Sequence, residues 1–229
     1  MEMIEKIRKA YTEYVLENGR QPTSVFQFAK KLKLAEAEFY NYYASFDAIE
    51  ADVWLALFND AKRTVEADAT YQTYSVREKA LAFYYTWIEM LKAQRSFVVY
   101  SYDRLKGTAN NMAMSPSMGE AGVMVRRKRK NAQVLMPFKG AFYDFARDLL
   151  AEGRESREVE PRPFLTDRYP NALWRQTIFI LDFWVRDVSK SFEKTDTAIE
   201  KSINTTFDLI GRSPLDTLFD FAKFAYQNR

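Results

Sequence analysis

A short segment near the N-terminus concentrates the side chains that could do chemistry. Between Leu34 and Glu50 it reads LAEAEFYNYYASFDAIE, in which phenol and amide groups crowd together beside the carboxylates of Glu36 and Glu38. These groups form hydrogen bonds but are poor catalysts on their own. The chain contains no histidine and no cysteine, so it lacks the commonest general base and any thiolate nucleophile or metal ligand.

Motifs for catalysis and cofactor binding are missing as well. The sequence has no HExxH and no DxDxDG-like calcium loop. It also has no GxGxxG or GxxxxGK[ST], and only seven glycines are spread over 229 residues, so a glycine-rich cradle for phosphates is not expected. We therefore expect a protein that is not an enzyme and that needs no cofactor or metal.

Charge and hydropathy limit the partners of the chain. The net charge is +3, from 34 basic and 31 acidic residues, which by itself does not argue for nucleic acid. The N-terminal MEMIEKIRKAY lacks the long apolar core of a signal peptide. No apolar run approaches the ~20 residues that a membrane span needs. We expect a soluble, cytoplasmic protein without a membrane span.

The elements that must position the aromatic segment are helices. Apolar residues recur with 3-4 spacing along most of the chain, and capping-box spacing begins at Ser24, Ser75 and Thr197. The pattern predicts an all-α fold of about nine or ten helices and no sheet. The segment from Ser96 to Tyr102 is ambiguous, because its aromatic and β-branched residues also suit a strand.

A loop and a kinked helix are predicted in the middle of the chain. Residues 106–122 are rich in Gly, Asn, Ser and Met, which is typical of a loop. A long helix is predicted over residues 123–152. Pro137 lies inside it and should kink it.

The three short N-terminal helices, with a tight turn between the second and third, have the pattern of a helix-turn-helix head. From about Ile4 to Asp60 the sequence resembles the DNA-binding head of TetR-family repressors. The last ~50 residues also resemble, more loosely, the C-terminal domains of some bacterial members. The matching positions of the head are Thr23, Ser24, Val25, Phe28-Ala29, Leu34-Ala35, Phe39-Tyr40, Tyr42-Tyr43, Ser45, Asp47 and Ile49.

The resemblance implies a function. Residues 1–46 would form a DNA-binding head and residues 47–229 a helical regulatory and dimerisation domain. The protein would be a dimeric repressor of a double-stranded DNA operator, released when a small apolar ligand changes the spacing of its two heads. Phe39 and Tyr43 would lie in the core. The implied DNA-binding residues are Thr23, Ser24, Lys33, Glu36, Glu38, Tyr40, Asn41 and Tyr42.

Departures from the family pattern keep a rival open. Lys33 stands where the family usually has a turn glycine, and Phe46 stands where a lysine often touches phosphate. Glu36 and Glu38 occupy the recognition helix, where a carboxylate can accept from cytosine N4 but repels phosphates. Residues 1–50 carry seven basic and eight acidic side chains, a net charge of −1. The rival is a lipid- or hydrophobic-ligand-binding protein of the same fold, whose head no longer reads DNA.

Aromatic and methionine residues in the middle of the chain have two interpretations. Most are expected to pack in the core. Because the family's second domain usually encloses an apolar cavity, and such side chains suit an adaptable pocket, some could line a ligand site. The candidates are Trp87, Met90, Met124, Phe138 and Phe142.

The densest basic run, RRKRK from Arg126 to Lys130, also has two interpretations. It could contact DNA or an anionic ligand. A solvated helix turn is favoured, because five consecutive residues cover more than one turn and point in several directions.

Two apolar C-terminal helices, over residues 171–192 and 196–210, are candidates for pairing with their copies in a homodimer. In the family such helices form a four-helix bundle across a two-fold axis. The alternative is that both are internal to a monomer. The candidate interface residues are Trp174, Ile178, Leu181, Val185, Ile199, Ile203 and Phe207.

Overall fold

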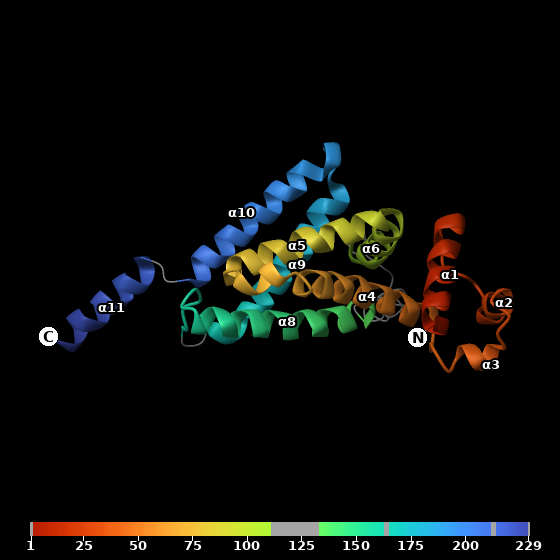
Figure 1. The fold of residues 1–229 in the computed structure, drawn as a ribbon, viewed down its shortest axis with the longest axis horizontal. Coiled ribbons are helices and arrows are strands. Elements are labelled where there is room, and N and C mark those ends of the chain that lie inside the picture. Colours follow the sequence, from red (N-terminus) through yellow and green to blue (C-terminus); the bar gives the residue numbers. More distant parts are fainter. Residues whose placement is uncertain (1, 111–132, 163–164, 212–213, 229) are drawn as a thin grey trace, which may run out of the picture. The chain divides into compact units, whose positions relative to one another are not determined.

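The structure is a computed structural model that describes residues 2–110, 133–162, 165–211 and 214–228. Within these ranges every regular element is helical, so the predicted all-α fold is confirmed (Figure 1). The α-helices are α1 (Glu2–Asn18), α2 (Val25–Lys31), α3 (Glu36–Phe39), α4 (Phe46–Glu66), α5 (Val76–Ala93), α6 (Arg95–Asn110), α8 (Met136–Glu155), α9 (Tyr169–Arg186), α10 (Glu193–Ile210) and α11 (Pro214–Gln227).

Local signals define the first helices as the sequence predicts. α1 ends at Asn18, and Gly19 follows with a φ of +63°, where its N–H donates to the Val15 carbonyl at 2.8 Å. A positive φ suits glycine because it has no Cβ. Ser24 caps α2 by accepting the Gln27 N–H at 3.3 Å. The Gly19 stop and the Ser24 cap are thus confirmed.

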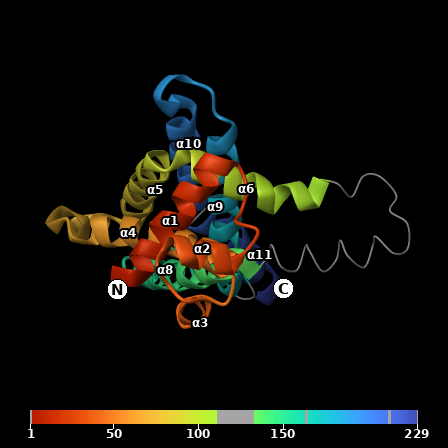
Figure 2. The same ribbon diagram turned by 90° about the vertical axis from the view of Figure 1, so that its right-hand side faces the viewer.

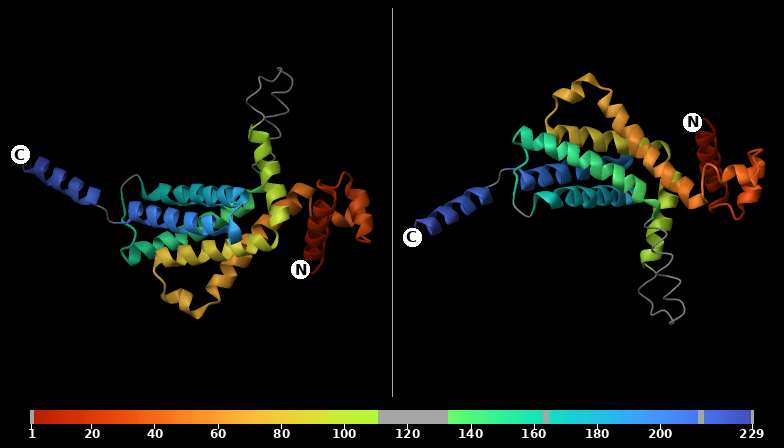
Figure 3. Two further views of the ribbon diagram at one scale, coloured as in Figure 1. Left: turned by 90° about the horizontal axis from the view of Figure 1, so that it is seen from above. Right: turned by 90° about the horizontal axis from the view of Figure 1, so that it is seen from below.

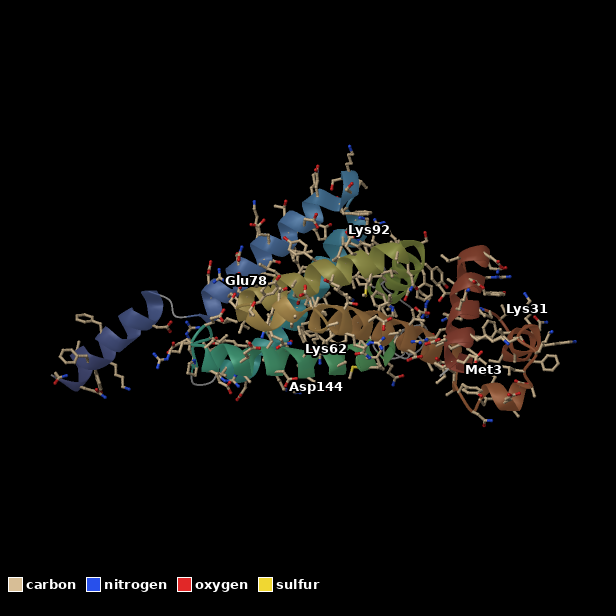
Figure 4. All side chains as sticks on the ribbon, viewed as in Figure 1. Met3, Lys31, Lys62, Glu78, Lys92 and Asp144 are labelled. Carbon is tan, nitrogen blue, oxygen red and sulfur yellow. The ribbon has the colours of Figure 1, made fainter. Side chains whose placement is uncertain are left out.

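The capping box at α5 is complete. The Ser75 hydroxyl accepts the Glu78 N–H at 3.3 Å, and the Glu78 carboxylate accepts the Ser75 N–H at 2.8 Å. Glu78 lies at the N-terminal end of α5 (Figure 4). The Ser75 hydroxyl also donates to the Glu78 carboxylate at 2.8 Å, and this hydrogen bond together with the one from the Ser75 N–H lowers the pKa of Glu78. The capping box thus satisfies the backbone N–H groups of Ser75 and Glu78, which have no hydrogen-bond partner within the helix.

The structure bears on three expectations about the middle of the chain. The ambiguous Ser96 to Tyr102 segment is helical and belongs to α6. The predicted loop over residues 106–122 begins too early, since α6 continues to Asn110; residues 111–122 lie outside the described ranges. The predicted long helix is interrupted at Leu135, a turn residue between the helical residues 133–134 and α8. Pro137 lies in the first turn of α8, where its missing N–H leaves no hydrogen bond unmade.

The contacts divide the chain into two compact units. The first contains residues 1–60 and 89–141, and the second contains residues 61–88 and 142–229. The head therefore packs together with the start of α4 and with α6. The predicted boundary between residues 46 and 47 is a functional division, and it stays a prediction.

The core of the first unit is aromatic beneath the head. Trp54 of α4 stacks on Phe138 of α8, with ring centroids 6.2 Å apart, and Phe58 lies 5.5 Å from the same ring. The Trp54 indole donates to the Ser101 hydroxyl of α6 at 2.8 Å. α4, α6 and the beginning of α8 are thus held together by buried side chains.

The second unit packs α5 and α8 against α9 and α10. Phe83 of α5 and Phe145 of α8 lie 4.7 Å apart. The Tyr84 hydroxyl of α5 and the Thr177 hydroxyl of α9 are 2.7 Å apart and buried. α9 and α10 run side by side (Figure 3).

The start of α10 differs from the prediction. Thr197 does not cap this helix, which begins at Glu193. The cap comes from Asp187, whose carboxylate accepts the Thr195 N–H at 2.9 Å and the Thr195 hydroxyl at 2.7 Å. Ser191 and Phe192, just before the helix, both have positive φ angles. Asp187 therefore supplies from upstream what an N-cap residue normally supplies.

Candidate nucleic-acid interface

The head consists of α1, α2 and α3, with a tight turn between α2 and α3 (Figure 2). Lys33 turns the chain between α2 and α3 with a φ of +60°. The Leu34 N–H that follows donates to the Ala29 carbonyl at 3.0 Å. The departure from glycine thus places a side chain in the left-handed region, which costs an L-residue about 1–2 kcal/mol.

The aromatic segment divides into buried and exposed side chains. Phe39 is fully buried and Tyr43 nearly so, as expected of core residues. Tyr43 also donates a hydrogen bond to Asp52 of α4. Tyr40 is 50% exposed and Tyr42 38%. The segment thus anchors the third helix with one set of rings and offers phenol groups to solvent with the other.

Phe46 belongs to the anchoring set. Its ring lies 5.4 Å from Phe28, 5.9 Å from Tyr11 and 6.1 Å from Phe39. A lysine at this position could not fill that space without burying its charge. The structure therefore gives a packing reason for this departure from the family pattern.

The other candidate DNA-binding residues are mostly exposed. Thr23, Lys33, Glu36, Glu38 and Asn41 are all exposed. The Ser24 hydroxyl is engaged in capping α2. The helix α3 is only one turn long, so Tyr40, Asn41 and Tyr42 follow it in a turn. If the head binds DNA, the end of α3 and the turn that follows it would make the contacts.

Sequence reasoning missed exposed side chains at the end of α2. Lys30 and Lys31 are exposed and lie in its last turn, close along the chain to Lys33. The ammonium of Lys31 lies 5.3 Å from the centre of the Tyr14 ring (Figure 4 labels Lys31). Phe26 is 56% exposed. The run KKLK was the available signal: three lysines in four residues beside the predicted turn.

A buried hydrogen-bond network lies behind the head, centred on Glu50 of α4. Glu50 is fully buried. One of its oxygens accepts from the Tyr11 hydroxyl at 2.9 Å, from the Gln21 amide at 3.0 Å and from the Arg104 guanidinium at 2.7 Å. The other accepts from the Ser101 hydroxyl at 2.5 Å. The network therefore joins α1 and the α1–α2 connection to α4 and α6.

The electrostatics of this network follow from its burial. Burial and the nearby Glu50 charge raise the pKa of Tyr11. Burial alone would lower the pKa of Arg104, but Glu50 and Asp47 outweigh it and raise the pKa. Arg104 is therefore fully charged, and it also lies 3.3 Å from the Asp47 carboxylate. Sequence reasoning missed Glu50 and Arg104 entirely.

The candidate ligand-pocket residues lie in aromatic cores. Phe138 packs in the first unit, as described above. Trp87 stacks on Phe83 in the second unit, at 6.3 Å, and Phe142 lies 5.6 Å from Trp174. Met90 is half-buried, and Met124 lies outside the described residues.

Three surface grooves among the described residues have volumes of about 340, 430 and 350 Å³, and residues other than Trp87, Met90, Phe138 and Phe142 border them. The apolar ligand pocket and its lining stay a prediction.

Most of the candidate dimer residues are used inside the chain. Trp174, Leu181, Ile199, Ile203 and Phe207 are buried by the chain itself. Ile178 and Val185 are half-buried. The exposed apolar surface of α9 is instead carried by Phe179, which is 50% exposed, and by half-buried Phe183, 6.2 Å away. A partner subunit could reach these side chains.

Comparison with known proteins bears on the C-terminal half. Residues 123–225 match the family model described as "Tetracyclin repressor-like, C-terminal domain". This part of the chain is similar to the C-terminal domains of that family. It includes α8, α9, α10 and nearly all of α11. The run from Arg126 to Lys130 falls within the match but outside the described residues, so its function stays open.

The fold has a similar solved structure. It is titled "Structure of a protein with unknown function from Rhodococcus sp. RHA1" and aligns with a TM-score of 0.53 over 91% of this chain and 95% of that one. The two sequences are 12% identical, so the likeness concerns the fold. No curated protein matches.

The described residues show two further features that bear on the partners of the chain. Its helices there include none long and apolar enough to cross a membrane. In the same ranges, no three acidic side chains gather where they could hold a metal ion.

Proposed function

We propose that this protein is a TetR-like transcriptional regulator, a cytoplasmic homodimer that represses genes by binding a double-stranded DNA operator through its head. The observation that carries the proposal is the division of the aromatic segment. Phe39, Tyr43 and Phe46 fix the third helix from inside, and Tyr40 and Tyr42 extend outward beside Asn41. Core residues alone would not need this exposed set of hydrogen-bonding groups.

The exposed groups differ in what they can recognise. Thr23, Tyr40 and Tyr42 carry hydroxyls that donate to phosphate oxygens, which positions the protein without reading sequence. Asn41 can form two hydrogen bonds with an adenine edge, which specifies a base. Lys30, Lys31 and Lys33 add the positive charge that phosphate binding needs. The lysines offset part of the repulsion from Glu36 and Glu38.

The network around Glu50 gives the head a way to respond to the rest of the protein. α6 supplies Ser101 and Arg104, and α1 supplies Tyr11. A small apolar ligand that favours another position of α6 would disturb these contacts and shift the population of head positions. The two heads of a dimer would then no longer match successive major grooves, ~34 Å apart, and the operator would be released.

Dimerisation is assigned to the outward face of α9. Phe179 and Phe183 are apolar, lie one turn apart and are accessible to a partner. They replace the buried residues Leu181, Ile199 and Ile203 as the side chains that a second copy would touch. Two copies related by a two-fold axis would each present this face to the other, which fits the two-fold symmetry of a palindromic operator.

Selection of bound sequences from random double-stranded DNA at low salt tests the regulatory function. We expect enrichment of a palindrome with half-sites about one helical turn apart. The matched control is the variant Asn41→Ala/Tyr40→Phe, whose altered residues are exposed and whose fold should be unchanged. A wild-type protein that enriches no sequence above this control would contradict the proposal.

One observation favours a second function. Glu36 and Glu38 are both exposed on α3, where they repel phosphates. This supports a lipid- or hydrophobic-ligand-binding protein whose head serves only the fold. Such a protein would bind apolar ligands and yet fail the DNA selection, so the same experiment separates the two functions.

A further inference from the structure

The last helix, α11, has exposed aromatic side chains that no described residue covers. Phe221 is 66% exposed, Phe224 63% and Tyr226 82%. Every other side chain that the structure describes between residues 221 and 228 is exposed as well. Phe221 and Phe224 are three residues apart, so they lie on neighbouring positions of one helix face.

The beginning of α11 is nonetheless firmly attached. Arg162 forms an ion pair with Asp216 at 2.6 Å, and each side chain is only 18% exposed. The same guanidinium donates to the carbonyls of Leu209 at 2.8 Å and Gly211 at 2.7 Å. The hydrogen bonds with Asp216 raise the pKa of Arg162. The helix therefore starts from a fixed point of the second unit.

The exposed aromatic side chains of α11 are expected to pack against another surface. α11 has 14 residues, and isolated helices of fewer than about 12–15 residues are marginal in water. Two or three exposed aromatic rings on such a helix would be better buried. The fixed start at Asp216 and the bare aromatic end together indicate that the second half of α11 packs on something else.

Charge argues against a membrane as the cover. The sequence of α11 contains Asp216, Asp220 and Lys223, a net charge of −1. Helices that lie on anionic lipid surfaces carry an excess of lysine and arginine on their polar face. A protein surface with its own apolar area is the better match.

Such a surface exists in the chain itself. α9 exposes half of Phe179, with Phe183 beside it, and the end of α10 exposes 65% of Leu209. We propose that α11 is an exchanged arm, whose aromatic face packs on the exposed face of α9 in a second copy of this chain. The inference rests on the proposed homodimer and names the part of each copy that completes it.

The area involved reaches that of a specific dimer. An aromatic side chain buries about 150–250 Å² when fully covered, so Phe221 and Phe224 at roughly two-thirds exposure offer about 200–330 Å². Two arms and their two receiving surfaces together bury roughly 800–1,300 Å² through these rings. This reaches the lower end of the range of a specific protein–protein interface, about 1,200–2,000 Å².

Sedimentation over a range of concentrations tests the arm. Phe221→Asp places a charge on the aromatic face and should raise the dimer dissociation constant at least about tenfold. Lys223→Gln is the matched control. It changes the net charge by the same amount at an exposed position of the same helix, about 160° from Phe221 and about 100° from Phe224, and should leave the constant unchanged.

The outcomes separate the arm from the dimer itself. A wild-type protein that stays monomeric at every concentration refutes both the homodimer and the arm. A wild-type dimer that Phe221→Asp does not weaken refutes the arm and leaves the homodimer standing.

Introduced cysteines identify the chain that receives the arm. The protein has no cysteine of its own, so every disulfide of the double variant Phe179→Cys/Phe224→Cys joins introduced cysteines. The single variants Phe179→Cys and Phe224→Cys control for links between identical positions of two copies. Exchange predicts that the double variant forms covalent dimers on oxidation and that neither single variant does. A disulfide-linked monomer would mean that α11 folds back on its own chain, and no disulfide would mean that it packs elsewhere; either result overturns the proposal. Glu200→Cys/Phe224→Cys, with the partner cysteine on α10, is the control and should stay unlinked.

Discussion

The Arg104 guanidinium lies 2.7 Å from the carboxylate of Glu50, which is fully buried. The two residues are far apart in sequence, one on α4 and the other on α6. A buried carboxylate is tolerated only when it is paired and its remaining lone pairs are satisfied. Tyr11, Gln21 and Ser101 complete that set of donors. The Glu50–Arg104 pair thus joins the head to α6. Removing only one of the two partners should lower the free energy of unfolding strongly, because the other charge is left unpaired.

Arg104→Met should therefore destabilise the protein by about 3–5 kcal/mol, because it leaves the Glu50 charge buried without its main partner. Urea unfolding followed by circular dichroism measures the cost. The double variant Glu50→Gln/Arg104→Met should lose less than the sum of the two single variants, since neither unpaired charge remains. Additive losses would mean that the two residues do not interact energetically.

Asp187 gives a prediction with a defined pH dependence. Burial would raise its pKa, but hydrogen bonds from Thr195 and Ser189 outweigh it and lower the pKa to about 2. A carboxyl whose folded pKa is depressed stabilises the fold above its unfolded value, about 3.9, and loses that contribution as the pH falls through 2.

Asp187→Ala should cost about 1–2 kcal/mol at neutral pH, as the loss of a helix cap does. The difference in unfolding free energy between wild type and variant should shrink as the pH falls from about 4 to about 2. Asn204→Ala, a half-buried position farther along α10, controls for general effects of acid. A difference that stays constant with pH would show that the Asp187 charge does not stabilise α10.

Local signals in the sequence were enough to predict most helices of the fold. Ser24, Ser75 and Gly19 each mark a helix boundary through contacts within four residues. The start of α10 was missed because its cap, Asp187, lies eight residues before Thr195. Pro137 was placed inside a helix because the apolar period continues across it, although the helix begins beside it.

The candidate site was predictable only in part, for a related reason. A 3-4 pattern identifies the apolar side of a helix, and so separates Phe39 from Tyr40. It does not identify the element that covers this side. The stripe of α9 and α10 was consequently expected to meet a second copy, whereas Leu181 and Ile199 are buried within one chain. The Glu50–Arg104 pair has no periodic signal at all.

Lys33 offers a test of backbone strain at the turn of the head. Its φ of +60° is costly for any residue with a Cβ and free for glycine. Lys33→Gly should stabilise the protein by about 0.5–1 kcal/mol, seen as a higher midpoint of thermal unfolding. Lys30→Gly removes the same charge inside α2 and should instead cost about 1 kcal/mol. Equal effects of the two substitutions would contradict the strained turn.

Tyr40 and Asn41 should affect DNA binding in different ways. Tyr40→Phe removes a phosphate contact and should weaken binding to all sequences about equally. Asn41→Ala should relax preference at one base pair, at a cost of about 1–3 kcal/mol. Binding titrations against the selected operator and its single-base variants measure both. If Tyr40→Phe changed sequence preference while general affinity stayed intact, the assignment of the two side chains would be reversed.

Glu36 and Glu38 decide most directly between a regulator and a protein with a structural head. They lie two residues apart, about 200° around a helix, and both are exposed, so at most one points into a groove. If the head reads DNA, Glu36→Gln and Glu38→Gln should each raise non-specific affinity by removing phosphate repulsion. At least one should also reduce discrimination at a cytosine, whose N4 donates to a carboxylate.

The measurement is a titration of wild type and both variants against DNA fragments at several salt concentrations. Glu17→Gln, an exposed acid on α1 away from the α2–α3 turn, is the control and should change affinity least. Saturable, sequence-dependent binding by the wild type at moderate salt would exclude the structural head. Its absence from all the proteins, with apolar-ligand binding intact, would leave the second function standing, because exposed carboxylates on α3 would then repel DNA without reading it.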